Sequence, residues 1–292
     1  MRTRALGPFT VSAVGLGAMP LSMGRNERPD REQAIATVHA ALDAGVTFID
    51  TADIYAPSWD TMGHNERIVA DALRAYPGDT SQVVVATKGG ITRGEGETWG
   101  RDGSPEYLRR AVESSLRALD RDVIDLYQFH RPDRWRVFGE VIETFKALQD
   151  EGLIRAIGIS NVNVEEIDVA VEVLGAGGLA SVQNEFSPRF RSSRDELEHC
   201  GGLGIAFLPW SPLGGTGAQS KEIGRTYPAF HEIGAERGVS PQQVVLAWEL
   251  SLGDHVIPIP GASRPESIRD SAQAAGLELS ADEIARIEGQ FR

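Results

Sequence analysis

The sequence is poor in cysteine, with only Cys200 among 292 residues. One thiol cannot form a disulfide within the chain, so a disulfide framework is excluded and a reducing compartment is indicated. Neighbouring His199 has no second cysteine or histidine at the spacing of a metal site, and we expect no metal ion there.

Basic residues are also in deficit. The chain has 29 Lys and Arg against 42 Asp and Glu, which gives a formal net charge of −13. Nucleic-acid binding requires clustered cations that release counterions from phosphates, so we expect no nucleic-acid partner. A phosphorylated small molecule requires only a local basic site, and this class of ligand stays open.

Long apolar runs are absent. No run approaches the roughly 20 residues of a membrane span, and residues 1–8 lack the apolar core of a signal peptide. Linker-like tracts, low-complexity blocks and near-identical repeats are absent too. Hydrophobic residues make up 41% and charged residues 24%, as in folded soluble proteins. We therefore predict a cytoplasmic protein with one domain over 1–292, without a membrane partner, as a monomer or weak homo-oligomer.

Short apolar runs alternate with segments of helical periodicity. The pattern predicts strands over 14–17, 46–49, 83–88, 123–130, 154–159, 181–183, 205–208 and 256–257, with helices over 30–44, 65–75, 104–119, 135–150, 164–174 and 194–200 and others starting near 240 and 264. Alternation of this kind is typical of parallel βα units, and eight units favour closure into a (β/α)8 barrel.

Three further segments fall outside the alternation. Residues 2–12 predict a hairpin that covers one end of the barrel, and helices are expected over 226–237 and 280–291. Ser280 and Glu283 have the spacing of a capping box. Long loops are expected over 18–30, 55–64, 89–103 and 209–225, all after strands, on the face where such barrels hold their active sites.

A nucleotide-binding loop of another fold is excluded near the amino terminus. Gly15 and Gly17 follow an apolar run, but Pro20 stands where a G-x-G-x-x-G motif needs its last glycine. A Ser nucleophile elbow is excluded as well, because 158–162 lacks the last glycine of G-x-S-x-G.

Four side chains with acid or base chemistry lie at the ends of predicted strands. Asp50 and Tyr55 follow the second strand, Lys88 ends the third and His130 ends the fourth. Taken singly, an Asp or Lys at a strand end is often a structural ion pair, a Tyr packs at an interface, and His130 caps the next helix. The carboxyl ends of barrel strands share one face, so the four side chains are expected to meet.

The settings of these residues, FIDTADIY, VVVATKGG and DLYQFHRPD, resemble the catalytic tetrad of the aldo-keto reductases. The likeness extends from 15–17 to 257–261, and two helices outside the barrel are also typical of that family. The resemblance implies an NADPH-dependent oxidoreductase that reduces the carbonyl of an aldehyde or ketone to an alcohol.

The expected roles follow from the chemistry of the side chains. Tyr55 is the proton donor, and Lys88 lowers the pKa of its phenol from an ordinary value near 10. Asp50 pairs with Lys88, while His130 orients the carbonyl and donates to its oxygen. Hydride transfer needs a nicotinamide, because none of these side chains carries reducing equivalents.

The resemblance also assigns cofactor contacts. Ser160, Asn161 and Gln183 match the residues that bind the carboxamide, although a turn-capping role for the Ser-Asn pair stays open. Residues 210–215 resemble the segment that stacks on the nicotinamide, and 261–267 precede a helix whose free amides attract phosphate. The full set is Gly17, Ala18, Met19, Asp50, Ser160, Asn161, Gln183, Trp210, Ser211, Pro212, Leu213, Gly215, Gly261, Ser263, Arg264, Ser267, Asp270 and Ser271.

Two positions depart from the family pattern. Trp210 replaces the common stacking tyrosine, and Asp270-Ser271 replaces the Glu-Asn pair that holds adenine. Arg264 can pair with a 2′-phosphate, which favours NADPH over NADH.

Substrate contacts are expected from Met19, Tyr55, Trp99 and His130. Trp59, Arg131, Trp135 and Phe190 also lie on loops after strands and are candidates for the mouth of an apolar pocket. The chain ends at Arg292, directly after the last helix, so we expect an open pocket. Two alternatives remain: a cofactor-binding regulatory subunit of the same fold with little turnover, and a barrel enzyme that uses another chemistry, such as a phosphate-dependent isomerase.

Overall fold

A curled sheet of parallel strands forms the centre of the protein. The structure is a computed structural model that describes residues 1–24, 28–215 and 222–291. Its seven-stranded sheet has the order β11-β10-β9-β8-β5-β4-β3. The strands are β3 (Leu16–Gly17), β4 (Phe48–Asp50), β5 (Val84–Gly89), β8 (Ile124–Phe129), β9 (Ile154–Ser160), β10 (Leu179–Gln183) and β11 (Ala206–Phe207). This arrangement confirms the predicted α/β barrel class.

Residues 255–261 join the two edges of the sheet. The amide of Phe207 donates to the carbonyl of His255, and the amides of Gly15 and Gly17 donate to the carbonyls of Pro258 and Pro260. Pro258 and Pro260 accept these bonds but have no N–H with which to donate a bond back to β3. The segment therefore forms isolated bridges instead of the eighth strand predicted over 256–257.

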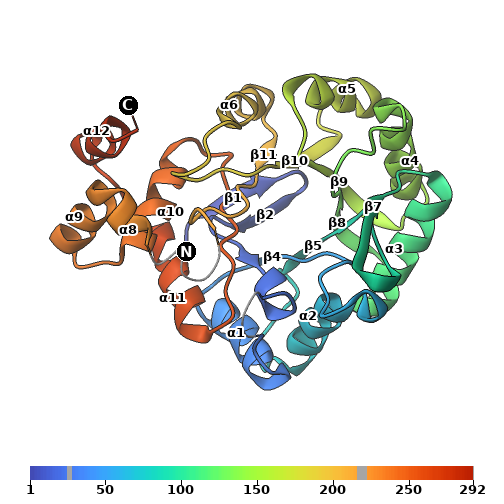
Figure 1. The fold of residues 1–292 in the computed structure, drawn as a ribbon, viewed down its shortest axis with the longest axis horizontal. Coiled ribbons are helices and arrows are strands. Elements are labelled where there is room, and N and C mark those ends of the chain that lie inside the picture. Colours follow the sequence, from blue (N-terminus) through green and yellow to red (C-terminus); the bar gives the residue numbers. More distant parts are fainter. Residues whose placement is uncertain (25–27, 216–221, 292) are drawn as a thin grey trace.

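Helices surround the sheet when the molecule is seen along the barrel (Figure 1). Asp30, Ser104 and Ser240 each accept a hydrogen bond from the amide three residues on, as their places before helices predicted. The helices of the ring are α1 (Arg31–Asp43), α2 (His64–Ala75), α3 (Pro105–Leu119), α4 (Phe138–Asp150), α5 (Val164–Leu174), α6 (Arg194–Leu203), α10 (Pro241–Ser251) and α11 (Pro265–Gln273), with the short η1 (Met19–Leu21) and η4 (Ala274–Gly276) at connections.

The extra helices lie to one side of this ring in Figure 1. They are α8 (Ile223–Thr226), α9 (Pro228–Arg237) and α12 (Ala281–Gly289). Ser280 and Glu283 form the predicted capping box, and Arg237 binds the Glu283 carboxylate at 2.7 Å. This pair ties α9 to α12. No helix in the described part of the chain is long and apolar enough to cross a membrane.

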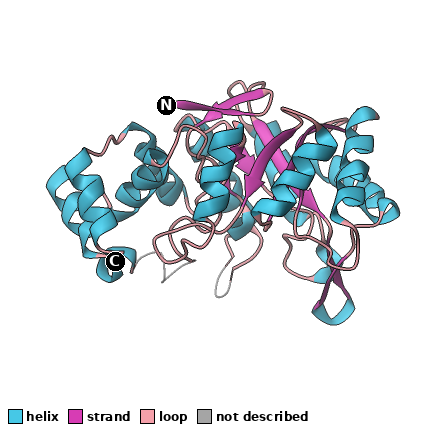
Figure 2. Cartoon of the chain, turned by 90° about the horizontal axis from the view of Figure 1, so that it is seen from above, coloured by secondary structure: helices cyan, strands magenta, loops and turns pink. Residues whose placement is uncertain are grey.

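The amino-terminal hairpin seals one end of the barrel. Strands β1 (Thr3–Leu6) and β2 (Phe9–Ser12) pair antiparallel, and Leu6 and Val11 pack with the inward side chains of the barrel strands. Figure 2 shows this hairpin at one end and the long loops at the other. The hairpin covers one end of the barrel, as predicted, and we call the other end, from which the long loops extend, the open end.

The segment predicted as a loop over 89–103 contains a second hairpin. Strands β6 (Ile91–Gly94) and β7 (Thr98–Arg101) pair antiparallel around the turn η3 (Glu95–Glu97). Another short helix, η2 (Trp59–Thr61), lies in the loop after β4. The loop prediction was wrong for 91–101, because this polar segment with three glycines lacks a strong period-2 pattern.

Candidate active site

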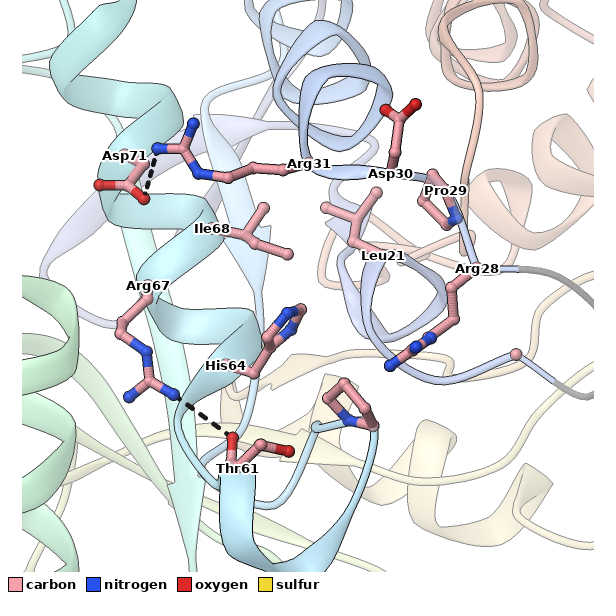
Figure 3. A pocket seen from close by; sticks show the side chains of 12 residues that line it. Leu21, Arg28, Pro29, Asp30, Arg31, Thr61, His64, Arg67, Ile68 and Asp71 are labelled. Carbon is pink, nitrogen blue, oxygen red and sulfur yellow. Dashed lines mark hydrogen bonds and ion pairs between the residues drawn. The ribbon is translucent and has the colours of Figure 1, made fainter.

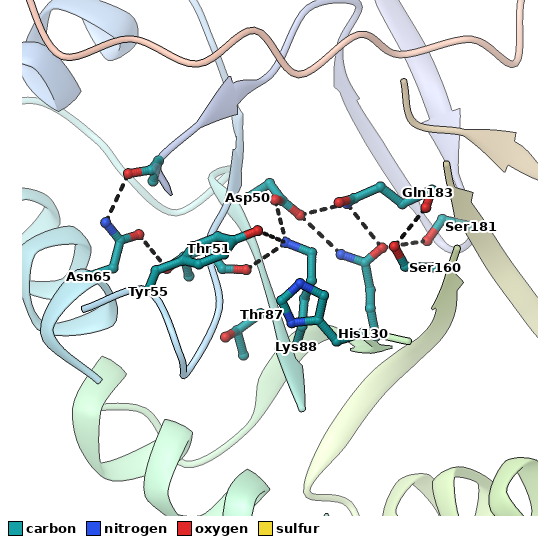
Figure 4. Close-up of polar contacts among 12 residues, drawn as sticks. Asp50, Thr51, Tyr55, Asn65, Thr87, Lys88, His130, Ser160, Ser181 and Gln183 are labelled. Carbon is teal, nitrogen blue, oxygen red and sulfur yellow. Dashed lines mark hydrogen bonds and ion pairs between the residues drawn. The ribbon is translucent and has the colours of Figure 1, made fainter. Parts of the chain in front are cut away.

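Three of the four predicted side chains meet around the amine of Lys88 (Figure 4). Its Nζ lies 2.5 Å from Oδ1 of Asp50, 2.8 Å from the carbonyl oxygen of Thr51 and 3.5 Å from the hydroxyl oxygen of Tyr55. The fourth, His130, has its ring edge-on to the Tyr55 ring, with centroids 5.8 Å apart. The structure thus brings together the four residues that the sequence singled out.

Strand alternation directs these side chains inward. Phe48 and Ala86 belong to the interior cluster, so Asp50 and Lys88, two residues further on, face the same side. His130 directly follows β8 and lies four residues after Leu126, another member of the interior cluster, so it faces the same side. Tyr55 comes from the turn after β4, where its amide donates to the carbonyl of Ala52.

Gln128 is a member of the site that the sequence analysis missed. Its Nε2 donates to Oδ2 of Asp50 at 3.0 Å, and Nε2 of Gln183 donates to the same oxygen at 2.8 Å. Both oxygens of Asp50 are therefore bonded to nitrogen donors. The available signal was its place two residues before His130 on one strand, because alternation puts both on the inner side.

Gly158 provides the room for this amide. A Cβ there would lie 2.4 Å from Oγ of Ser181 and 2.8 Å from Cγ of Gln128. A register irregularity between Leu179 and Ser181 in β10 turns Gln183 toward the interior as well.

Burial and charge act in opposite directions on the Lys88 amine and the Tyr55 phenol. For Lys88, burial favours the neutral amine, but Asp50 and Tyr55 outweigh it and raise the pKa of the ammonium. For Tyr55, burial raises the pKa of the phenol, and the nearby Lys88 cation only partly offsets that effect. The expectation that Lys88 brings the Tyr55 pKa below its ordinary value was wrong, because desolvation is the larger effect.

The imidazole of His130 is held neutral. Burial, followed by the charges of Lys88 and Arg131, lowers the pKa of this side chain well below its ordinary value. Its Nδ1 is buried and has no hydrogen-bond partner within the described residues. A neutral ring keeps one N–H to donate, which suits a group that binds a carbonyl oxygen.

The predicted carboxamide-binding residues lie beside this cluster. The Ser160 hydroxyl donates to the carbonyl of Gln183 at 2.6 Å, and Nδ2 of Asn161 donates to Oγ of Ser160 and to the carbonyl of His130. Asn161 adopts a left-handed conformation with φ of 60°. These bonds show the structural role of the Ser160-Asn161 pair in the turn. Contact of the pair with a carboxamide stays a prediction.

Trp210 lies at the open end, partly buried against the interior cluster. Its backbone amide donates to the carbonyl of Asn184, and its buried Nε1 has no partner in the part of the chain that the structure describes. Ser211, Pro212, Leu213 and Gly215 follow it, with Ser211 left-handed at φ of 56°. Residues 216–221 of the loop predicted over 209–225 lie outside the described residues.

The start of α11 has the features of an anion site. Arg264 is its N-cap residue, and no side chain caps the helix. Pro265 has no N–H and the amide of Ser267 donates to the carbonyl of Arg264 at 3.2 Å, so in this first turn the amide of Glu266 remains for an acceptor from outside the helix. Ser267 lies in that first turn, and Gln33 binds the carbonyl of Ser263 at 2.8 Å.

The side chains of Asp270 and Ser271 are engaged within the protein, Asp270 by hydrogen bonds and Ser271 by burial. The two oxygens of Asp270 accept hydrogen bonds from Oγ of Ser240 and Nε2 of Gln243 on α10, and Ser271 is buried. Contact of either side chain with adenine stays a prediction.

Gly17 and Gly261, near β3, lie where a side chain would collide with neighbouring atoms. A Cβ on Gly17 would lie 2.7 Å from the carbonyl oxygen of Ile259, and one on Gly261 would lie 2.9 Å from Pro20. The amide of Ala18 donates to the carbonyl of Asp50, which places Met19 at the open end.

Aromatic side chains lie exposed around the loop end. The exposed fractions are 39% for Trp59, 50% for Trp99, 96% for Trp135 and 37% for Phe190. Trp99 packs its ring 4.8 Å from the guanidinium carbon of Arg93. Their contact with substrate stays a prediction, as does that of Arg131.

A separate cleft of about 870 Å³ lies between the start of α1 and α2 (Figure 3). Its wall includes His64, whose Nδ1 is 2.9 Å from the hydroxyl of Ser22, and Arg67, whose guanidinium donates to the carbonyl of Thr61. None of Asp50, Tyr55, Lys88 and His130 lines it.

The fold and the site define a class: an α/β barrel with a buried Lys-Asp ion pair, a tyrosine and a neutral histidine at the open end. A model of the aldo/keto reductase family matches residues 13–290, and the chain belongs to this family.

Known proteins of similar sequence and structure are oxidoreductases. An uncharacterised oxidoreductase of Schizosaccharomyces pombe is 34% identical over 98% of this chain and 89% of its own length. Pyridoxine 4-dehydrogenase of Escherichia coli is 31% identical over 99% and 98%. The structure of an aldo/keto reductase from Klebsiella pneumoniae in complex with NADP and acetate has a TM-score of 0.80, 26% identity and coverage of 100% and 96%. The chain is an oxidoreductase of the family.

Proposed function

We propose that this protein reduces the carbonyl of an aldehyde or ketone to an alcohol with NADPH, and that Tyr55 is the general acid. The observation that carries the proposal is the place of the Lys88 amine, between the carboxylate of Asp50 and the hydroxyl of Tyr55. A protonated phenol beside a fixed cation is suited to give a proton to an oxygen that gains negative charge.

The raised pKa of Tyr55 fits this role. Burial keeps the phenol protonated at neutral pH, which the donor in a reduction must be. When the proton leaves, the Lys88 ammonium faces the new phenolate, and the raised pKa of Lys88 ensures that this ammonium is charged. Asp50, held by Gln128 and Gln183, keeps the ammonium in place.

Substrate orientation falls to His130. The ring is neutral and lies against the ring of Tyr55, so one N–H can donate to the same carbonyl oxygen that Tyr55 protonates. Two donors on one oxygen stabilise the charge that develops there.

The residues present fit NADPH, which when bound supplies the hydride. Ser160 and Asn161 offer neutral polar groups for an amide, and the indole of Trp210 has an unpartnered Nε1 among described residues at the open end. The uncapped start of α11 with Arg264 suits a phosphate.

The test has two steps. Tryptophan fluorescence should be quenched as NADPH is added, and NADPH absorbance should then fall with carbonyl substrates. We choose pyridoxal, an aromatic aldehyde and a keto sugar as the panel, because the related Escherichia coli protein is a pyridoxine dehydrogenase. Quenching without turnover on the whole panel would favour a regulatory subunit over the reductase.

A further inference from the structure

Arg93 is a buried arginine beside the active site. It lies in β6, and only 5% of its side chain is exposed. A buried guanidinium must have its N–H groups bonded, because an unpaired charge in the interior is costly. The partners of these N–H groups therefore show what the residue holds.

The guanidinium bonds to the backbone on both sides of Tyr55. Its Nη1 donates to the carbonyl oxygen of Ala56 at 2.8 Å and to that of Ile54 at 3.3 Å, and Nη2 donates to that of Pro57 at 3.3 Å. No other residue in the described ranges donates to these three oxygens. Ile54 and Ala56 are buried, so loss of Arg93 leaves their carbonyls without a partner.

Glu97 and Trp99 hold the guanidinium in this position. Nε of Arg93 donates to Oε2 of Glu97 at 2.6 Å, and the ring of Trp99 lies 4.8 Å away. The other oxygen of Glu97 accepts from the backbone amide of Trp59 at 2.9 Å. The hairpin β6–β7 thus binds the segment 54–59 in two places: Arg93 binds the carbonyls of residues 54, 56 and 57, and Glu97 binds the amide of Trp59.

The Tyr55 ring packs against His130 and against the cluster of Ala52, Ile54 and Ile91. Its hydroxyl has one hydrogen bond among described residues, the 3.5 Å contact with Lys88. The backbone of Tyr55 itself is held by two bonds, from its amide to the carbonyl of Ala52 and from the amide of Asn65 to its carbonyl. Arg93 holds the carbonyls of the residues directly before and after it, Ile54 and Ala56. Arg93 therefore holds the neighbours of Tyr55 on both sides.

We propose that Arg93 is a positioning residue for the general acid, and that it acts with Glu97 to hold the Tyr55 segment against the β6–β7 hairpin. This inference rests on the proposed function, in which Tyr55 donates the proton. A shift of about 1 Å at a reacting group can lower a rate about 100-fold. Loss of the bonds from Arg93 to the Tyr55 segment, which we call the clamp, therefore acts on the chemical step. NADPH binding does not depend on it.

The test uses the full chain with Arg93→Ala and Arg93→Lys. We expect kcat for carbonyl reduction to fall at least about tenfold in Arg93→Ala and less in Arg93→Lys, with the Kd for NADPH within about threefold of the parent. Guanidinium chloride at a few millimolar should restore part of the lost kcat to Arg93→Ala, whereas equal sodium chloride should not. Arg109→Ala is the matched control, because Arg109 pairs with Glu151 on the surface.

A purely structural role would lower the melting temperature without a change in kcat of the folded protein and without rescue. That result, or a kcat within twofold of the parent, would overturn the inference. If Arg93→Ala fails to fold, Glu97→Gln and Arg93→Lys decide: both should lower kcat at unchanged NADPH affinity, and parental kcat in both would overturn it. Tyr55→Phe is measured in parallel. A fully active Tyr55→Phe would overturn the acid assignment itself, whereas an inactive Tyr55→Phe beside a fully active Arg93→Ala would overturn only the clamp.

Discussion

The side-chain amide of Gln128 donates a hydrogen bond to Oδ2 of Asp50 over 3.0 Å. This bond fixes the carboxylate whose other oxygen binds Lys88. The tetrad therefore depends on a neutral residue that has no acid or base chemistry of its own.

Replacement of Gln128 tests this dependence. Gln128→Met keeps the volume but removes the donor, and a hydrogen bond to a charged group contributes roughly 1.5–3 kcal/mol. We expect kcat to fall about 10-fold to 100-fold, with NADPH affinity nearly unchanged. Steady-state kinetics and a fluorescence titration measure both, and an unchanged kcat would show that Gln183 alone holds Asp50.

The rate of reduction should be flat between pH 6 and 9. The pKa of His130 lies well below 6.5, so the ring stays neutral across this range, and the pKa of Tyr55 lies above 10, so the phenol stays protonated. The rate should decline only at higher pH, where Tyr55 loses its proton. An inflection near pH 6.5 in a kcat profile that disappears in His130→Gln would contradict the neutral histidine.

Arg264 should set the preference for the phosphorylated cofactor. Loss of a charge-assisted contact with a 2′-phosphate costs about 1.4 kcal/mol or more, which is about tenfold in affinity. Arg264→Ala should therefore raise the KM for NADPH about tenfold and leave that for NADH unchanged. Equal effects on both cofactors would place Arg264 elsewhere than at the 2′-phosphate.

Glu249 makes stability depend on pH. It is completely buried in α10, no described residue bonds its carboxyl oxygens, and burial raises its pKa well above 4.5. The folded state therefore favours the protonated acid. Protonation of Glu249 therefore adds to the free energy of unfolding. This contribution is fully present below pH 4.5, the ordinary pKa of the unfolded chain, and is lost as the pH rises through the higher pKa of the folded state.

Glu249→Gln should accordingly be more stable than the parent at pH 7. Each tenfold difference in proton affinity corresponds to about 1.4 kcal/mol, and we expect a gain of about 1–3 kcal/mol that shrinks toward pH 4.5. Urea unfolding at pH 4.5 and pH 7 measures it. A gain that is the same at both pH values would show that ionisation of Glu249 is not the cause.

Sequence patterns predicted the parts of this protein that local periodicity controls. The helix over 164–174 matches α5 (Val164–Leu174), and Asp30 caps α1 as its type and position indicated. The meeting of Asp50, Lys88 and Tyr55 followed from strand ends that share one face. These features depend on neighbours within a few residues or on a general property of parallel barrels.

The features that escaped prediction depend on contacts between distant segments. Arg93 bonds to carbonyls 36–39 residues earlier in the chain, and Gln128 bonds to Asp50 across 78 residues. The direction of the Tyr55 pKa depended on burial, which a list of neighbouring charges does not reveal. Side-chain bonds to backbone and the degree of desolvation require the folded structure.

In the proposed reaction the phenol of Tyr55 gives the proton. Tyr55→Phe removes only the hydroxyl, and loss of a general acid lowers a rate about 100-fold to 10,000-fold. We expect single-turnover reduction of an aromatic aldehyde to fall by at least about 100-fold while the Kd for NADPH stays within about threefold of the parent. A Tyr55→Phe protein that binds NADPH and reduces the aldehyde at the parental single-turnover rate would contradict the account.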